Sequence, residues 1–156
     1  MDSREKRSVK IVEYNPAWKA FYYQYKKMIH TVLPDAKVEL IGSAAIPMVG
    51  KKEIDILVIC DDVEKAHSVL EKLAFGRGPI TKEGGYLSDS RFGVEAEFHV
   101  VATGSKKIDN ARRLIARLQS DKPLRDRLEF LKRSWDGLSR EEYRKHKAEF
   151  LGSIQW

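Results

Sequence analysis

Asp55 is the residue around which the chemistry of this sequence can be organised. It lies in the apolar segment 54–60, whose β-branched residues and short length predict a strand. A carboxylate in an apolar strand is costly unless a cation, a hydrogen-bond donor or a metal ion faces it. An earlier apolar segment, 38–41, ends at Gly42 and Ser43, a pair typical of a turn. We therefore expect a strand, a Gly-Ser turn and then the strand that carries Asp55.

A second set of residues that could bind a cation lies in segment 92–101, where apolar and polar residues alternate. Because side chains alternate along a strand, Glu95, Glu97 and His99 fall on one face and the apolar side chains on the other. Two carboxylates and an imidazole on one face could hold a divalent ion. By itself, however, the alternation favours a simpler interpretation, an edge strand with a wet outer face.

The segment from Gly42 to Val58 resembles the GrpB family. The matching motif is Gly-Ser-Ala-Ala-Ile-Pro at 42–47, followed without a gap by Lys51 and by Ile-Asp-Ile-Leu-Val at 54–58. The resemblance extends over nearly the whole chain, through Tyr14, Pro16, Trp18, Phe98, His99, Val100, Leu131, Lys132, Tyr143, Lys147 and Phe150. The sequence departs from the family pattern at Ala44, Met48, Lys52 and Glu97, where the family usually has Thr, Gly, Pro and often a second His.

This family is similar to a branch of the nucleotidyltransferase superfamily. The resemblance therefore implies an α/β (α+β) nucleotidyltransferase-like fold, with a small mixed β-sheet packed against helices and with C-terminal helices. In that superfamily a Gly-Ser turn precedes a strand with two carboxylates, a neighbouring strand adds a third, and together they hold two divalent ions. Here the first carboxylate is Asp55, but the residue two positions later on the same face is Leu57. Half of the carboxylate pair is missing.

The resemblance also implies roles for particular residues. Asp55 and Glu97 would be catalytic, and Asp55, Glu97 and His99 would hold magnesium or manganese, although zinc also suits a mixed carboxylate and imidazole set. The remaining candidates would meet phosphates, namely Gly42, Ser43, Lys51, Lys132 and Lys147. We expect Asp55 and at least one of Glu97 and His99 to face a common cleft with Ser43 at its rim. Some of Lys132, Arg133, Arg144 and Lys147 should lie near its mouth.

Two functions of different classes fit these residues. In the first, the protein is an enzyme that transfers a nucleoside monophosphate to an acceptor. In the second, it is a catalytically inactive module that binds a nucleotide or a coenzyme A-like ligand, and some members of the family are fused to dephospho-coenzyme A kinase. In the second case Asp55 would pair with a base such as Lys51, Lys132 or Lys147 and would hold no metal. The sequence identifies no acceptor and no oligomeric state.

Composition limits the remaining interpretations. We expect one domain over residues 1–156, with residues 1–8 frayed, because this length supports one core. A lone cysteine, Cys60, and the lack of a signal peptide or a spanning segment favour a cytoplasmic protein with no membrane contact. The net charge of +6 comes from residues 106–156, with 14 Lys and Arg against 8 Asp and Glu. Such an excess suits a nucleotide, another phosphorylated molecule or RNA, or simply a solvated helical surface.

Hydrophobic periodicity and capping residues predict the other elements. Helices are expected from Asn15 to before Leu33, after Asp62, and throughout residues 106–156, with Ser139 capping the last helix. His67 is expected on the surface of its helix. Residues 75–85 are expected to form a loop or an irregular hairpin.

Overall fold

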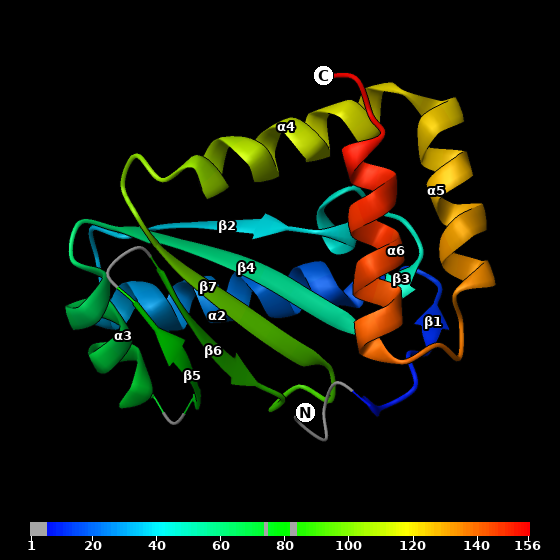
Figure 1. Cartoon of the computed structure of the whole chain (residues 1–156). Coiled ribbons are helices and arrows are strands. Elements are labelled where there is room, and N and C mark those ends of the chain that lie inside the picture. The colour runs from blue at the N-terminus through cyan, green and yellow to red at the C-terminus, as the bar shows by residue number, and fades with distance from the viewer. Residues whose placement is uncertain (1–5, 74, 82–83) are drawn as a thin grey trace.

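The structure is a computed structural model of the chain, and it describes residues 6–73, 75–81 and 84–156. Figure 1 shows the elements in their arrangement. In chain order they are β1 (Ile11–Val12), α2 (Ala17–Val32), β2 (Lys37–Ile41), the 3-10 turn η1 (Ser43–Ala45), β3 (Gly50–Lys51), β4 (Glu53–Cys60), α3 (Val63–Glu71), β5 (Gly76–Ile80), β6 (Gly84–Asp89), β7 (Glu95–Ala102), α4 (Lys106–Ser120), α5 (Lys122–Ser134) and α6 (Arg140–Gly152). No helix among the described residues has the length and apolar character needed to cross a membrane.

The main sheet has five strands in the order β2-β4-β7-β6-β5. Strands β4 and β7 are parallel, and the other neighbouring pairs are antiparallel. The expected mixed sheet packed against helices is therefore confirmed, with β2, β4 and β7 close to the three predicted strands. The edge-strand interpretation of segment 92–101 is wrong, because β7 lies between β4 and β6.

The two faces of this sheet have different partners. One face carries the main hydrophobic core, in which Ile56, Val58 and Phe98 pack against Tyr25 and Ile29 of α2, and α3 covers the same side. Figure 1 shows α2 running behind the sheet, whereas α4 crosses above it and α5 and α6 stand beside it. The second face therefore looks towards the C-terminal helices.

The C-terminal helices have a core of their own. Leu118 of α4, Leu128 of α5 and Phe150 of α6 pack together with Val9 and Ile46 from the first third of the chain. The small sheet of β1 and β3 lies at this junction. The N-terminal segment and the helices thus form one unit that is fixed beside the main sheet.

The chain start differs from the prediction at two residues. Of the segment 1–8 that we expected to be frayed, residues 1–5 lie outside the described residues. Ser8 forms an antiparallel bridge with Ser139, and the carbonyl of Arg7 accepts a 3.1 Å hydrogen bond from the amide of Arg140. These backbone contacts join the chain start to the first turn of α6.

The predicted helix caps at Asp62 and Ser139 are confirmed, but the position of His67 is not. Asp62 accepts from the amide of Lys65 at 3.1 Å, and Ser139 accepts from the amide of Glu142 at 3.1 Å. His67 is buried, because the hairpin of β5 and β6 covers it. Its Nε2 lies 3.1 Å from the carbonyl of Tyr86, and its Nδ1 lies 2.9 Å from Glu71. The expected surface position was wrong because the period of the helix does not show that a later hairpin packs on it.

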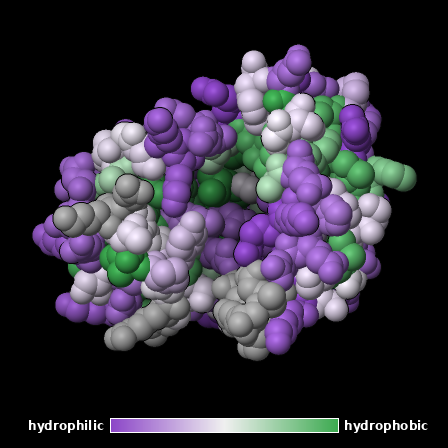
Figure 2. Space-filling model, in the orientation of Figure 1, coloured by the Kyte–Doolittle hydropathy of each residue, from purple (hydrophilic) through white to green (hydrophobic). Residues whose placement is uncertain are grey.

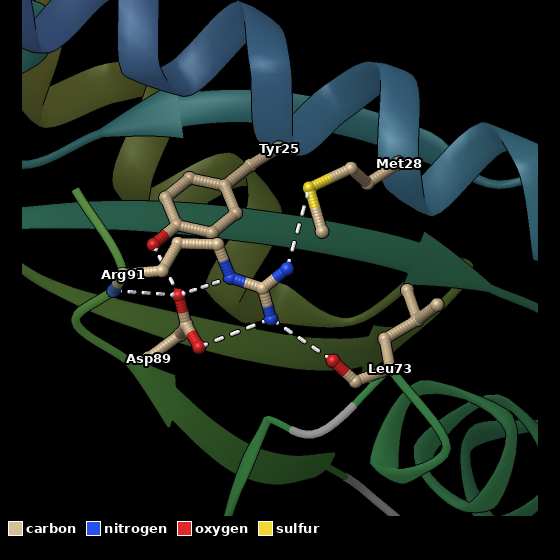
Figure 3. A network of polar contacts seen from close by, with 5 residues as sticks. All are labelled: Tyr25, Met28, Leu73, Asp89 and Arg91. Atoms are coloured by element: carbon tan, nitrogen blue, oxygen red, sulfur yellow. Dashed lines mark hydrogen bonds and ion pairs between the residues drawn. The ribbon is translucent and has the colours of Figure 1, made fainter.

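A polar network fastens the turn after β6 to α2 and to the end of α3 (Figure 3). Asp89 accepts a 2.6 Å hydrogen bond from the Tyr25 hydroxyl and one of 2.8 Å from Nε of Arg91. The Arg91 guanidinium also donates to the carbonyl of Leu73 at 2.9 Å. Burial alone would raise the pKa of Asp89, but the hydrogen bonds from Arg91 and Tyr25 outweigh it and lower the pKa. This network stabilises the core side of the sheet and leaves the opposite face free of it.

Candidate functional site

The parallel register of β4 and β7 brings the predicted acidic residues together. Asp55 is the direct neighbour of Glu97, and Leu57 is the neighbour of His99. Since paired residues point to the same side of a sheet, these side chains lie on the face opposite the main core. Asp55, Glu97 and His99 line a cavity of about 790 Å³ between this face and the C-terminal helices, together with Gly42 and Ser43. The expected common cleft is present, and it is also lined by Lys51, Lys132 and Lys147.

Asp55 pairs with His99 in the folded state. Its Oδ1 lies 3.1 Å from Nε2 of His99, and about a quarter of its side chain is exposed. Burial tends to raise the pKa of this carboxyl, but the His99 hydrogen bond and the charges of His99, Lys147 and Lys51 outweigh it, so the pKa is lowered. The direct partner of Asp55 is thus a histidine, and lysines surround the pair.

The Gly-Ser turn lies against the Asp55 carboxylate. Gly42 has φ of 71°, in the left-handed region that favours glycine, and an added Cβ would lie 2.8 Å from Oδ2 of Asp55. Two local hydrogen bonds fix the turn, from the amide of Ala45 to the carbonyl of Gly42 and from the amide of Met48 to that of Ser43. Glycine at 42 is therefore needed both for the backbone conformation and for the close approach to Asp55.

Two lysines from the C-terminal helices reach into the cavity. Lys132 of α5 is only 3% exposed, and its Nζ donates to the carbonyl of Val49 at 3.3 Å. Burial, with the charges of Lys147 and Lys51, lowers the pKa of Lys132 to about 7. Burial also lowers the pKa of Lys147 of α6, although the charge of Asp55 opposes this. Within the described residues, neither lysine has a carboxylate within 4.0 Å.

Three further residues of the site were missed by the sequence analysis, namely Glu53, Arg140 and Tyr143. Glu53 is 6% exposed and lies 3.3 Å from Arg140 and 3.6 Å from Lys51. Burial and then the charge of Asp55 raise the pKa of Glu53. A signal for Glu53 was available, because a residue two positions before Asp55 shares its strand face. No local pattern marks Arg140, which reaches Glu53 and, at 3.8 Å, Glu97 from the start of α6.

Most of the basic residues expected at the cavity are found there. Lys132, Arg144 and Lys147 line it, whereas Arg133 points elsewhere and pairs with Glu13 at 2.7 Å. The lining residues comprise three acids, Glu53, Asp55 and Glu97, and five bases, Lys51, Lys132, Arg140, Arg144 and Lys147. Bases exceed acids in this lining, so the cavity favours an anionic ligand. Figure 2 shows the hollow with a hydrophilic floor and with hydrophobic surface above it.

The donor set fits one divalent ion. Asp55, Glu97 and His99 each offer one ligand atom, and these atoms lie within 4.8 Å of one another. An ion among them would replace the hydrogen bond between Asp55 and His99. A second acidic group, Glu53, Glu95 and Glu97, is already engaged, since Arg140 and Lys51 pair with Glu53. The position where the superfamily has its second carboxylate is Leu57, which is 1% exposed in an apolar cluster.

Comparison of the sequence with known proteins shows to which family the chain belongs. The family described as GrpB protein matches residues 8–155. A curated relative, the UPF0157 protein VC_A0354 of Vibrio cholerae, is 33% identical over 147 residues, which are 91% of this chain and 78% of the relative. The UPF0157 protein BH1888 of Halalkalibacterium halodurans is 28% identical over 156 residues, covering 94% of this chain and 78% of that protein.

Solved structures show the same fold. The conserved protein GrpB from Enterococcus faecalis superimposes with a TM-score of 0.70 at 22% identity, over 80% of this chain and 81% of that chain. The Cid1 poly(U) polymerase with MgGTP bound gives a TM-score of 0.57 at 15% identity. That match covers 72% of this chain but 40% of the polymerase, so it concerns only part of the enzyme. This chain belongs to the GrpB family and has a nucleotidyltransferase-like fold.

Proposed function

We propose that this protein binds a nucleotide through its phosphates in the cavity between β4, β7 and the C-terminal helices, together with one divalent ion. The observation that carries the proposal is the pair Lys132 and Lys147. Both point into a cavity in which the carboxylates have other partners, His99 for Asp55 and Arg140 for Glu53. An ammonium group that is held away from solvent is costly unless an anion meets it, so the two lysines favour a phosphate ligand.

The residues of the chain would divide the work as follows. Lys132 and Lys147 bind phosphate oxygens, and the Ser43 hydroxyl lies on the lining beside them. Asp55, Glu97 and His99 hold magnesium or manganese, and Arg140 keeps Glu97 and Glu53 in place. When bound, the ion supplies positive charge that neutralises the phosphates. The GTP and magnesium named for the Cid1 polymerase structure motivate the choice of nucleotide and metal.

Calorimetric titration with GTP in the presence of manganese tests the proposal. We expect saturable binding that weakens as salt is raised, because screening acts on charge contacts. Lys147→Met should reduce nucleotide affinity, whereas Lys145→Met, which removes an exposed lysine from the same helix, should not. Manganese binding is measured by paramagnetic resonance, in which the signal of free manganese falls as the ion binds. The wild type should reduce this signal, and Asp55→Asn should not. Lack of nucleotide binding at any salt concentration would refute the proposal.

A second candidate function is transfer of the nucleoside monophosphate to an acceptor, which could be RNA. It is favoured by the position of Asp55 and Glu97, two carboxylates on adjacent parallel strands that face one cavity. It predicts release of pyrophosphate when a nucleoside triphosphate, manganese and RNA are supplied, and Glu97→Gln should abolish this release. Nucleotide binding without pyrophosphate would favour the inactive module.

That inactive module would bind a nucleotide or a coenzyme A-like ligand. In this version of the proposal the protein would be functionally linked to dephospho-coenzyme A kinase. Titration with coenzyme A and with dephospho-coenzyme A tests this version directly. A cytoplasmic location is also part of the proposal, because Cys60 is a free thiol and suits a reducing compartment.

A further inference from the structure

Helix α4 has an apolar face that is fully buried only at its two ends. Ile108 is buried against Leu57 and Val101 at the start of the helix, and Leu118 is buried in the C-terminal core near its end. Between them Ala111, Leu114 and Ile115 continue the face at the spacing of a helix. Leu114 and Ile115 pack in part against the C-terminal core, and all three residues are half-buried and line the cavity. The middle of α4 is therefore an apolar roof over the same cavity that holds the carboxylates and lysines.

The position of this roof is fixed from outside the cavity. Arg112 makes a two-pronged ion pair with Glu39 of β2, the register neighbour of Leu57, and neither Arg112 nor Glu39 lines the cavity. Gln119, near the helix end, donates to the carbonyl of Ala45 at 3.2 Å. These contacts hold α4 along β2, the edge strand of the main sheet, and against η1. Figure 2 shows hydrophobic surface above the hollow.

An aromatic side chain forms the wall opposite the first part of the roof. Tyr86 of β6 is 38% exposed and packs edge-on against His99, with 5.1 Å between ring centroids. Lys107 of α4 lies over the Tyr86 ring at 5.4 Å, and Ala111 follows Lys107 by one helical turn. Ala111 is thus on the side of α4 that faces Tyr86, and both residues line the cavity.

The space between Ala111, Leu114 and Tyr86, here called the slot, and the proposed phosphate site belong to one cavity. The distance between them can be worked out from the strand order. Tyr86 is the register neighbour of His99, which is the neighbour of Leu57, so Tyr86 lies two strands away from β4. Neighbouring strands are about 4.8 Å apart, which places Tyr86 about 10 Å from the strand of Asp55. One ligand with a charged end and a flat apolar end could reach both regions.

We propose that the slot between Ala111, Leu114 and Tyr86 holds the nucleobase of the bound nucleotide. The inference rests on the proposed nucleotide binding and adds what recognises the part of the ligand beyond the phosphates. A purine or pyrimidine ring has a flat π-face that stacks on a tyrosine, and its other face would contact the aliphatic roof. Stacking of this kind tolerates every base, so we expect little preference among ATP, GTP, CTP and UTP.

The test compares ATP with inorganic tripolyphosphate, both titrated calorimetrically into the full chain with magnesium. Tripolyphosphate has the charged end of the ligand and lacks the ring. We expect ATP to bind more tightly by about 5- to 150-fold, the range that corresponds to one base stacked on an aromatic side chain. Tyr86→Ala and Ala111→Leu, which remove the wall and fill the slot, should each eliminate most of this difference and leave tripolyphosphate affinity unchanged.

Matched control variants distinguish loss of the slot from the general effects of removing a tyrosine or enlarging an alanine. Tyr23→Ala removes an exposed tyrosine from α2, and Ala116→Leu enlarges an exposed alanine of α4, and neither residue lines the cavity. Both should retain the wild-type preference for ATP. Equal affinity of the wild type for ATP and tripolyphosphate would overturn the slot and keep the phosphate site, as would an ATP preference that persists in Tyr86→Ala and Ala111→Leu. Binding of neither compound would overturn the proposed function itself.

Discussion

Replacement of Lys132 by methionine should make the protein more stable while it weakens phosphate binding. Lys132 is 3% exposed, its Nζ contacts one carbonyl at 3.3 Å, and no carboxylate among the described residues lies within ion-pair distance. Methionine has a similar length and would fill the same space without charge. Because the variant buries no charge, its free energy of unfolding should be higher than that of the wild type.

The pKa of Lys132 gives the sign and the size of this effect. In the unfolded chain its ordinary value is 10.5, and in the folded protein burial lowers the pKa to about 7. Between these pH values the unfolded chain holds a proton that the folded protein has released, so stability rises as pH rises from 7 towards 10.5. At 1.36 kcal/mol per pKa unit, the lysine costs about 4 kcal/mol at pH 7, and by pH 9.5 the cost falls by about 3 kcal/mol.

Urea unfolding of the wild type and of Lys132→Met at pH 7.0 and pH 9.5 measures both quantities. Lys147 also has a lowered pKa and contributes a slope of the same sign, so the informative value is the difference between the two proteins. We expect Lys132→Met to exceed the wild type in stability at pH 7.0 by up to about 4 kcal/mol and to show the smaller rise with pH. Lys145→Met, which removes an exposed lysine of α6, should leave the stability at both pH values near that of the wild type.

One result would refute this reasoning. If Lys132→Met were less stable than the wild type at pH 7.0 and kept the same rise with pH, the ammonium of Lys132 would be stabilised by its surroundings. The charge of Asp55, which already opposes the lowering of the Lys132 pKa, would then outweigh burial. Lys132 would in that case be a structural partner of the carboxylates. The argument that it binds phosphate would then be refuted.

Three further predictions concern other parts of the structure. Gly42→Ala should destabilise the protein by at least about 1 kcal/mol in urea unfolding, because its φ is positive and its Cβ would press on the Asp55 carboxylate. Tyr25→Phe should cost about 1 kcal/mol through the lost hydrogen bond to Asp89 and should leave nucleotide affinity unchanged in calorimetry, since this network lies on the core side of the sheet (Figure 3). Glu97→Gln should weaken manganese binding measured by paramagnetic resonance, whereas Glu149→Gln, an exposed change on α6, should not.

The local parts of this fold could be predicted because their causes are local. The apolar segment around Asp55, the alternation before Val101 and the caps at Asp62 and Ser139 each depend on a few consecutive residues, and each corresponds to an element of the structure. The pairing of Asp55 with Glu97 is different, because it depends on the register of two strands that are separated by α3 and the β5-β6 hairpin. It was expected from the family resemblance, and the alternation alone favoured an edge strand.

The residues that the sequence did not reveal are those brought in by packing between distant segments. Arg140 belongs to no sequence motif and lies at the start of α6. The backbone contact to Arg7 and the ion pair with Glu53 place it in the site. His67 is buried by a hairpin that follows its helix in the chain. Burial by a later element leaves no trace in the helical period, so only the tertiary structure could give these positions.

Leu57 links the single-ion site to the roof of the cavity, and it provides a last prediction. Its side chain, on the same face as Asp55, packs with Ile59, Val101 and Ile108, the residue that fixes the start of α4. A carboxylate at 57 would restore the superfamily's second metal ligand but would bury a charge beneath α4. We therefore expect Leu57→Asp to lose more stability than the roughly 2–5 kcal/mol of a buried leucine-to-alanine change, and to bind no second manganese ion. Measured by urea unfolding and manganese titration, a stable Leu57→Asp protein that binds two ions would show that the roof does not depend on Leu57. In this protein, then, the packing that fixes the start of α4 occupies the position that a second carboxylate ligand would need.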